Sequence, residues 1–174
     1  FTGAQVPIGR IRTDARENLI TALQIAGTKQ DGKSLVPEVC IYFRNLLLRG
    51  NRAKKVESSH FDAFKSDNYP PLAETGIDIE YSSENILLHP NQVLRVHKQL
   101  SDKVAILKLF PGITPLAVQA ILQADGLRGV VLETFGSGNA PSAPWFLELM
   151  HNALDSGIHI LNVSQCDEGR VIQG

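Results

Sequence analysis

The sequence predicts an α/β protein of two domains, each built on a parallel sheet flanked by helices. After residue 100, short apolar runs alternate with helix-like segments over short links, the order that builds parallel sheets with right-handed crossovers. Before residue 80, a helix-like segment precedes a long apolar run. Because the first residue is not Met and GRVIQG stops in mid-pattern, we expect the fold to be incomplete at both ends.

Residues 1–80 are predicted to form the later part of the first domain. Thr13 or Asp14 can cap a helix in ENLITALQIAG, where Gly27 suits the C-terminal cap. Apolar residues recur there at helical spacing: Leu19, Ala22, Leu23 and Ala26. The run VPEVCIYFRNLLL, 36–48, predicts one buried strand ending at an Arg-Gly-Asn turn.

Residues 81–100 lack a sustained period and are predicted to be a connector with a short edge strand at 85–88. Residues 101–174 predict a second, partial α/β domain. Thr114 and Pro115 mark the start of its first helix. Its expected elements are strands at 103–110, 129–136 and 158–164, with helices after Thr114 and in PWFLELMHNALDSG.

Composition limits the function. The 174 residues are 43% hydrophobic and 20% charged with a net charge of −1, so a globular protein without affinity for nucleic acid or anionic membranes is expected. Apolar runs end well short of the roughly 18 residues that cross a bilayer. Two distant cysteines, Cys40 and Cys166, are typical of a reducing compartment, which predicts a cytoplasmic location.

No metal and no cofactor are predicted. The five histidines lack paired metal-site spacing; they are His60, His89, His97, His151 and His159. The loop GSGNAP, 136–141, resembles the dinucleotide fingerprint G-x-G-x-x-G, but Pro141 occupies the place of the third glycine.

Three segments carry a resemblance to a known family: TGAQVP (2–7), TDARENL (13–19) and RGNRAKKVESSHFDAFKSDNYPPLAETG (49–76). They resemble the L-asparaginase family, closest to its type I, cytosolic branch. Ala15 departs from a family glycine, which puts the local turn geometry in doubt. In the loop at 136–141, Asn139 matches a family asparagine.

The resemblance implies hydrolysis of the L-asparagine side-chain amide to L-aspartate and ammonia by a threonine nucleophile. It implies that Lys55 belongs to a Thr-Lys-Asp relay and that the Ala4 backbone helps to hold the substrate amide. It also implies a homodimer or a dimer of dimers. The family's two threonine-bearing motifs lie upstream of the position that Phe1 would occupy, so we expect an internal fragment that is inactive alone.

The chemistry explains why a lysine would be used. A threonine hydroxyl is a weak nucleophile near neutral pH and needs a base to accept its proton. Because a free lysine has a pKa of about 10.4, it must be desolvated or placed beside positive charge to serve. Arg49, Arg52 and Lys54 are close to Lys55 in the sequence and could supply that charge.

Two alternatives remain open. The related component of a transfer-RNA-dependent amidotransferase, which generates ammonia, shares the fold and the lysine relay. A non-catalytic nucleotide- or ligand-binding α/β module is the other alternative, with the incomplete glycine fingerprint as its only support.

Overall fold

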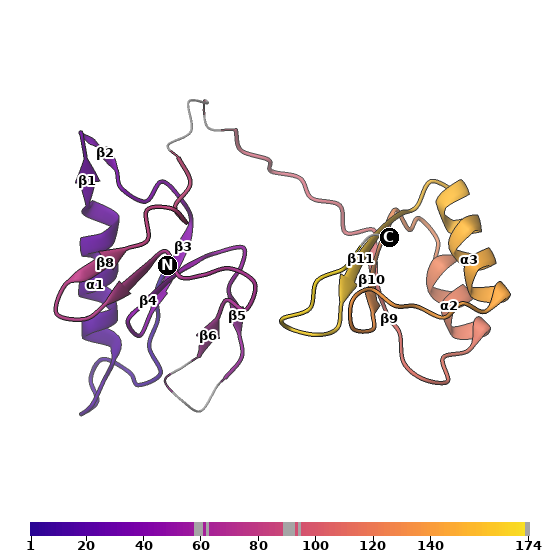
Figure 1. Cartoon of the computed structure of the whole chain (residues 1–174), viewed down its shortest axis with the longest axis horizontal. Coiled ribbons are helices and arrows are strands. Elements are labelled where there is room, and N and C mark those ends of the chain that lie inside the picture. The colour runs from indigo at the N-terminus through magenta and orange to yellow at the C-terminus, as the bar shows by residue number, and fades with distance from the viewer. Residues whose placement is uncertain (58–60, 62, 89–92, 94, 173–174) are drawn as a thin grey trace. The chain divides into compact units, whose positions relative to one another are not determined.

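The computed structural model describes residues 1–57, 61, 63–88, 93 and 95–172. The chain forms two compact units, Phe1–Leu94 and Arg95–Gly174 (Figure 1). Their boundary lies within residues 81–100, the stretch predicted as a connector. Each unit has its own cluster of buried apolar side chains. The fold therefore rests on two separate cores.

The first unit contains helix α1, Ala15–Gly27, which confirms the helix predicted there. The Thr13 hydroxyl accepts a hydrogen bond from the Ala15 amide at 3.0 Å, satisfying one of the exposed amides at the helix start. Asp14 occupies the N-cap position but makes no side-chain capping bond. Its carboxylate is used elsewhere.

Only part of the predicted apolar stripe of α1 is buried. Ile25 is 5% exposed and joins the first core, and Ala22 packs against it. Leu19 and Leu23 remain 46% and 64% exposed. The helix thus packs along one edge of the stripe rather than along its centre.

The single strand predicted over residues 36–48 is wrong, because the run folds back on itself. Strands β3, Cys40–Phe43, and β4, Leu46–Arg49, pair antiparallel. Between them Arg44 and Asn45 have φ angles of 41° and 60°. Two successive positive φ values are the signature of the tight hairpin turn whose twist matches the flanking strands.

The hairpin continues into a four-stranded sheet of order β3-β4-β7-β8 whose pairs are all antiparallel, so the parallel sheet predicted for each domain is found in the second unit, whereas this sheet of the first unit is antiparallel. Here β7 is Ala73–Thr75 and β8 is Ile79–Tyr81. The edge strand predicted at 85–88 is wrong, since those residues form a turn and a bend followed by irregular structure. Two small ribbons complete the unit: β1 (Lys29–Gln30) with β2 (Lys33–Ser34), and β5 (Lys54–Lys55) with β6 (Phe64–Lys65).

The second unit confirms the predicted alternation of strands and helices. The elements are β9 (Val104–Lys108), α2 (Pro115–Leu122), β10 (Gly129–Thr134), α3 (Pro144–Asp155) and β11 (His159–Ser164). The strands pair in parallel in the order β11-β10-β9. The Thr114 hydroxyl accepts from the Ala117 amide at 3.3 Å, the capping bond expected at the start of α2.

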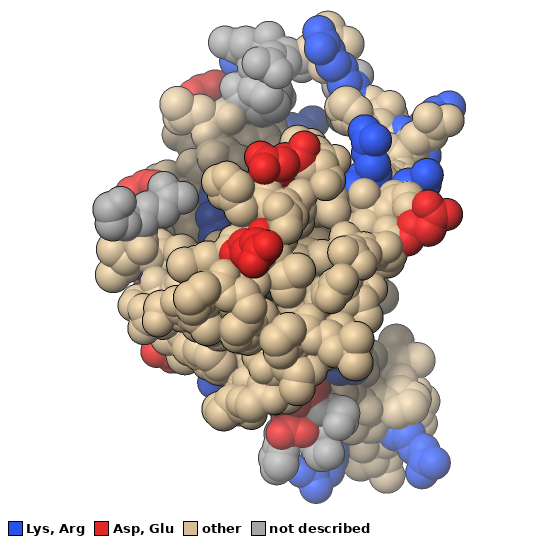
Figure 2. All heavy atoms as spheres, turned by 90° about the vertical axis from the view of Figure 1, so that its right-hand side faces the viewer, with Lys and Arg blue, Asp and Glu red and all other residues tan. Residues whose placement is uncertain are grey.

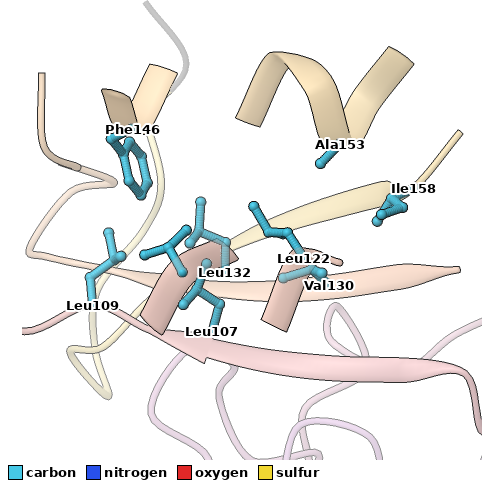
Figure 3. Close-up of a cluster of buried hydrophobic side chains, with 9 residues drawn as sticks. Leu107, Leu109, Leu122, Val130, Leu132, Phe146, Ala153 and Ile158 are labelled. Carbon is cyan, nitrogen blue, oxygen red and sulfur yellow. The ribbon is translucent and has the colours of Figure 1, made fainter. Parts of the chain in front are cut away.

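The core of this unit lies between the sheet and its two helices (Figure 3). Leu107 on β9 and Leu132 on β10 point toward Phe146 of α3, which is 2% exposed. Alternate residues face the other side of the sheet, where Ile106 and Leu161 are 64% and 62% exposed. The alternation follows from the period of 2 along a strand.

The outer surface of α2 and α3 carries few charges (Figure 2). None of the eight residues of α2 is charged, and Leu116 and Leu147 are 77% and 56% exposed. The helical face of the second unit thus offers little charge for acid–base chemistry.

In the described ranges, no helix combines the length and apolar character needed to cross a bilayer.

The two faces of β9 provide a direct test of the second core. Replacing Leu107, 1% exposed, by Ala is expected to lower the free energy of unfolding by about 2–5 kcal/mol, since it leaves a cavity. Ile106→Ala, on the open face, should change it by about 0.5 kcal/mol or less. Trp145, the single tryptophan, lies in α3 and reports urea unfolding of this unit by fluorescence. Equal losses for the two variants would contradict the assigned core.

Candidate functional site

The first residues of the chain run beside β3. The Phe1 ammonium donates to the Cys40 carbonyl at 2.8 Å, and the Tyr42 amide donates to the Phe1 carbonyl at 2.9 Å. The Thr2 hydroxyl donates to the Tyr42 carbonyl at 2.8 Å. Ala4, which follows, is exposed. Ala4 thus lies at the surface, directly after residues that are hydrogen-bonded to β3.

Asn18 fixes the next part of this segment. Its side chain is on α1 and the residue is only 4% exposed. The amide nitrogen donates to the Gly3 carbonyl at 3.0 Å and to the Asp14 carboxylate at 3.2 Å. The amide oxygen accepts from the Arg44 backbone amide at 3.1 Å. One buried side chain thus joins the first segment, the helix and the hairpin turn.

Asp14 holds the following two residues. Its carboxylate accepts from the Gln5 amide at 3.0 Å and from the Val6 amide at 2.9 Å. Burial alone would raise the pKa of Asp14, but these backbone bonds and the bond from Asn18 hold that pKa below its ordinary value. Ala15, where the sequence departs from the family glycine, opens α1 and is not among the residues with positive φ. The departure therefore leaves the turn unstrained.

Lys55 lies on the β5–β6 ribbon, where it pairs with Phe64. Its side chain is exposed, and β5 belongs to an antiparallel ribbon rather than to the carboxyl edge of a parallel sheet. The Phe64 ring packs on Phe43 with centroids 5.3 Å apart. The same ring lies near Gly3, since a Cβ added to Gly3 would be 3.8 Å from Cε2 of Phe43. The segment of Ala4 and the ribbon of Lys55 therefore both come close to Phe43.

Two phenylalanines, Phe61 and Phe64, follow Lys55 in the chain. Phe64 belongs to strand β6, and its ring packs on that of Phe43. Both phenylalanines line a hollow beside the hairpin turn together with Arg44 and Ala63. Asp62, part of the same motif, lies outside the described residues.

Arg49 does not leave an uncompensated charge near Lys55. Its guanidinium forms a two-bond ion pair with the Glu38 carboxylate, one bond at 3.0 Å, and the two side chains are 12% and 3% exposed. It also donates to the Asn85 carbonyl and stacks on the Tyr69 ring at 4.1 Å. The expectation that Arg49 supplies positive charge to Lys55 thus overlooked Glu38.

Glu38 ties the end of the first unit to its sheet. Its carboxylate accepts from the Leu87 amide at 2.6 Å, in addition to the bonds from Arg49. Burial alone would raise the pKa of Glu38, but the bonds from Arg49 and Leu87 hold it below the ordinary value. The residues predicted as an edge strand at 85–88 are thus held by side-chain bonds instead of a ladder.

Neither cysteines nor histidines form a reactive centre in the described part of the chain. Burial, followed by the nearby charge of Glu38, raises the pKa of the Cys40 thiol to about 11, so that little thiolate exists near neutral pH. Residues 1–57, 61, 63–88, 93 and 95–172 contain no group of three His, Cys, Asp or Glu side chains able to hold a metal. His60 and His89 lie outside these residues.

The loop at 136–141 follows β10 and precedes α3, as predicted, but it is closed on itself. The amides of Gly138 and Asn139 both donate to the Phe135 carbonyl, at 2.9 and 2.8 Å. A phosphate-binding loop needs such amides free to point at the ligand. The geometry thus argues against the dinucleotide-binding alternative.

Two family models match the chain: "Asparaginase, N-terminal" over residues 1–87 and "Glutaminase/Asparaginase C-terminal domain" over residues 103–174. The 60 kDa lysophospholipase of Homo sapiens is 44% identical over 172 residues, which cover 98% of this chain and 29% of that protein. L-asparaginase 1 of Escherichia coli strain K12 is 35% identical over 173 residues, which cover 99% of this chain and 49% of that protein.

Among solved structures, L-asparaginase I from Vibrio cholerae O1 biovar eltor is similar with a TM-score of 0.90 and 34% identity, covering 99% of this chain and 51% of that one. One component of the glutamyl-tRNA(Gln) amidotransferase of Methanothermobacter thermautotrophicus is 31% identical over 179 residues, 98% of this chain and 39% of that protein. The chain spans about half, or less, of the length of these relatives.

The Glu38–Arg49 pair predicts a pH-dependent stability of the first unit. Because the pKa of Glu38 is lowered on folding, its contribution is present above the unfolded pKa, about 4.3, and is lost as the pH falls through the folded value. At pH 7, Glu38→Gln is expected to cost about 3 kcal/mol, since it leaves Arg49 buried without its counter-charge.

The measurement is urea unfolding followed by near-ultraviolet circular dichroism of the three tyrosines, which all lie in the first unit. Exposed Glu84 provides the matched control, and Glu84→Gln should change stability by about 0.5 kcal/mol or less. A Glu38→Gln protein as stable as the unmodified chain, with an unchanged loss of stability at acid pH, would contradict the assignment.

Proposed function

Because the chain belongs to the asparaginase family, we propose that it supplies part of the active site of an enzyme that hydrolyses L-asparagine to L-aspartate and ammonia. The observation that carries this proposal is similarity over both units at once to L-asparaginases from Escherichia coli and Vibrio cholerae. The chain spans about half of each of these two proteins. The reaction is accordingly proposed for a protein of their length.

In the proposed reaction, a threonine hydroxyl attacks the side-chain amide carbon of asparagine and Lys55 accepts the hydroxyl proton. The proton passes to the amide nitrogen as the C–N bond breaks, and ammonia leaves. Water then hydrolyses the ester to release aspartate and restore the hydroxyl. The family motifs T-G-G-T and H-G-T-D, which carry the threonines, do not occur in these 174 residues.

Two features support these roles for Lys55 and Ala4. Phe64 on the ribbon of Lys55 packs on the Phe43 ring, and Gly3, next to Ala4, lies near the same ring. Both Lys55 and Ala4 are exposed, so a ligand or a further part of the protein can reach them. A lysine that acts as a general base has to be desolvated or placed beside positive charge, and such a charge has to come from groups other than Arg49, which is paired with Glu38.

A cytoplasmic enzyme that acts as a homodimer or a dimer of dimers completes the proposal. Cys40 and Cys166 are both free thiols, which fits a reducing compartment. Similarity to L-asparaginase 1 of Escherichia coli agrees with the type I resemblance, and it is this resemblance that implies the location and the symmetric assembly.

The ammonia-generating component of an amidotransferase remains a second candidate because of the similarity to the Methanothermobacter protein. The lower identity, 31% against 35% for the Escherichia coli asparaginase, makes it the weaker one. Hydrolysis of asparagine without a partner protein separates the free-standing enzyme from a component that works with one.

The test uses a chimera in which these 174 residues replace the aligned region of Escherichia coli L-asparaginase 1. We expect ammonia release from asparagine by the chimera and none by the 174-residue chain alone. Lys55→Met in the chimera should lower kcat at least about 100-fold, the usual contribution of a general base. Lys54→Met, its neighbour on the same ribbon, should retain most of the activity.

Thermal unfolding monitored by circular dichroism shows whether each variant is folded. A folded chimera without activity toward asparagine would contradict the proposed reaction. Faster release of fatty acid from a lysophospholipid than of ammonia from asparagine by the chimera would also contradict it. Full activity of Lys55→Met would reject the relay role alone.

A further inference from the structure

We propose that Asp14 and Asn18 are positioning residues that turn the backbone N–H and C=O of Ala4 outward, toward the substrate amide. The inference rests on the proposed function for its substrate, but the orientation itself follows from hydrogen bonds within the first unit. The proposal includes no contact between the substrate and the side chain of Asp14 or Asn18. They act through the backbone of residues 3–6.

The first step of the argument concerns the peptide between Gly3 and Ala4. The Gly3 carbonyl accepts from the buried amide of Asn18 at 3.0 Å. In a planar trans peptide the carbonyl and the following N–H point in opposite directions, and no cis peptide occurs in the described chain. The Ala4 N–H therefore points away from Asn18.

The second step concerns the peptide between Ala4 and Gln5. The Gln5 N–H donates to the Asp14 carboxylate at 3.0 Å. By the same planarity, the Ala4 carbonyl points away from Asp14. Within the described residues, neither polar group of Ala4 takes part in a hydrogen bond, and Ala4 is exposed. The Ala4 N–H and the Ala4 carbonyl thus both point away from the start of α1, where one can donate and the other accept a hydrogen bond.

The third step is that the segment is held at several points. The Val6 N–H donates to Asp14 at 2.9 Å, and the Val6 carbonyl accepts from the Thr13 hydroxyl at 2.8 Å. Asn18 is in turn fixed by the Arg44 amide of the hairpin turn, at 3.1 Å. Because Asn18 is 4% exposed, water cannot readily replace it. The orientation of Ala4 is therefore prepared before a ligand binds, which lowers the cost of ordering it on binding.

A donor and an acceptor on one residue match a primary amide, which offers an acceptor oxygen and a donor NH₂ group. A carboxylate offers acceptors only. The Ala4 backbone would thus hold the amide of asparagine better than the carboxylate of aspartate, which favours release of the product.

The structural half of the test uses the 174-residue chain. Asp14→Asn should speed hydrogen exchange of the Gln5 and Val6 amides at least about tenfold, as measured by NMR, and Asn18→Asp should displace the Ala4 amide resonance. Glu17→Gln is the matched control, because it removes the same charge from an exposed position of the first turn of α1 and should change neither. Unchanged exchange in Asp14→Asn would overturn the inference.

The functional half uses the asparaginase chimera described above. Asp14→Asn and Asn18→Asp should raise KM for asparagine at least about tenfold while the inhibition constant for aspartate changes less, a difference that general loss of stability does not produce. Asn18→Ala provides a second variant if Asn18→Asp fails to fold.

The outcomes of this half separate the two proposals. An active chimera whose KM is unaffected by these variants overturns the positioning role and leaves the proposed function standing. A folded chimera without any activity overturns both the proposed function and the role of Ala4 in binding the substrate. Faster exchange in Asp14→Asn would then show only that Asp14 orders the backbone of residues 5 and 6.

Discussion

The reversal of the chain at Arg44 and Asn45 is the constraint on which the first unit depends. It lays β4 against β3, so that Arg49 comes opposite the start of β3 and meets the Glu38 carboxylate. It also presents the Arg44 amide to Asn18 and brings the Phe43 ring to the end of the hairpin, where Phe64 packs on it and Gly3 lies nearby. The segments of Ala4 and Lys55, about fifty residues apart in sequence, thereby come near the same ring.

The second unit could be predicted from sequence almost completely, and the first unit only in part. In the second unit, strands and helices differ in period and are separated by clear signals, such as Thr114 with Pro115 and the glycine that ends α3. In the run 36–48 no glycine or proline marks the reversal, and apolar residues stand on both sides of Arg44-Asn45. A hairpin whose two strands are both buried then has the same pattern as one long strand.

The residues of the candidate site also differ in how far the sequence could predict them. Lys55 and Ala4 were found only through the family resemblance, because a basic turn and a small exposed residue carry no signal of their own. Asp14 and Asn18 were missed as functional residues since an aspartate before a helix predicts a cap, and the actual partners of Asp14 lie eight and nine residues earlier. Sequence also cannot show which charges cancel, as the pairing of Arg49 with Glu38 across the hairpin demonstrates.

A site built on backbone groups places its sequence requirement on other residues. Any residue other than proline that is compatible with the local φ and ψ can offer the N–H and C=O that Ala4 offers, so the identity of Ala4 contributes little beyond its small size. What has to be specific are the side chains that orient its two peptides, and these must be an acceptor facing Gln5 and a donor facing Gly3. Asp14 and Asn18 supply one each from adjacent turns of the same helix end, and the spacing of four residues places them on one face. The chemical specificity of such a segment thus resides in the helix behind it.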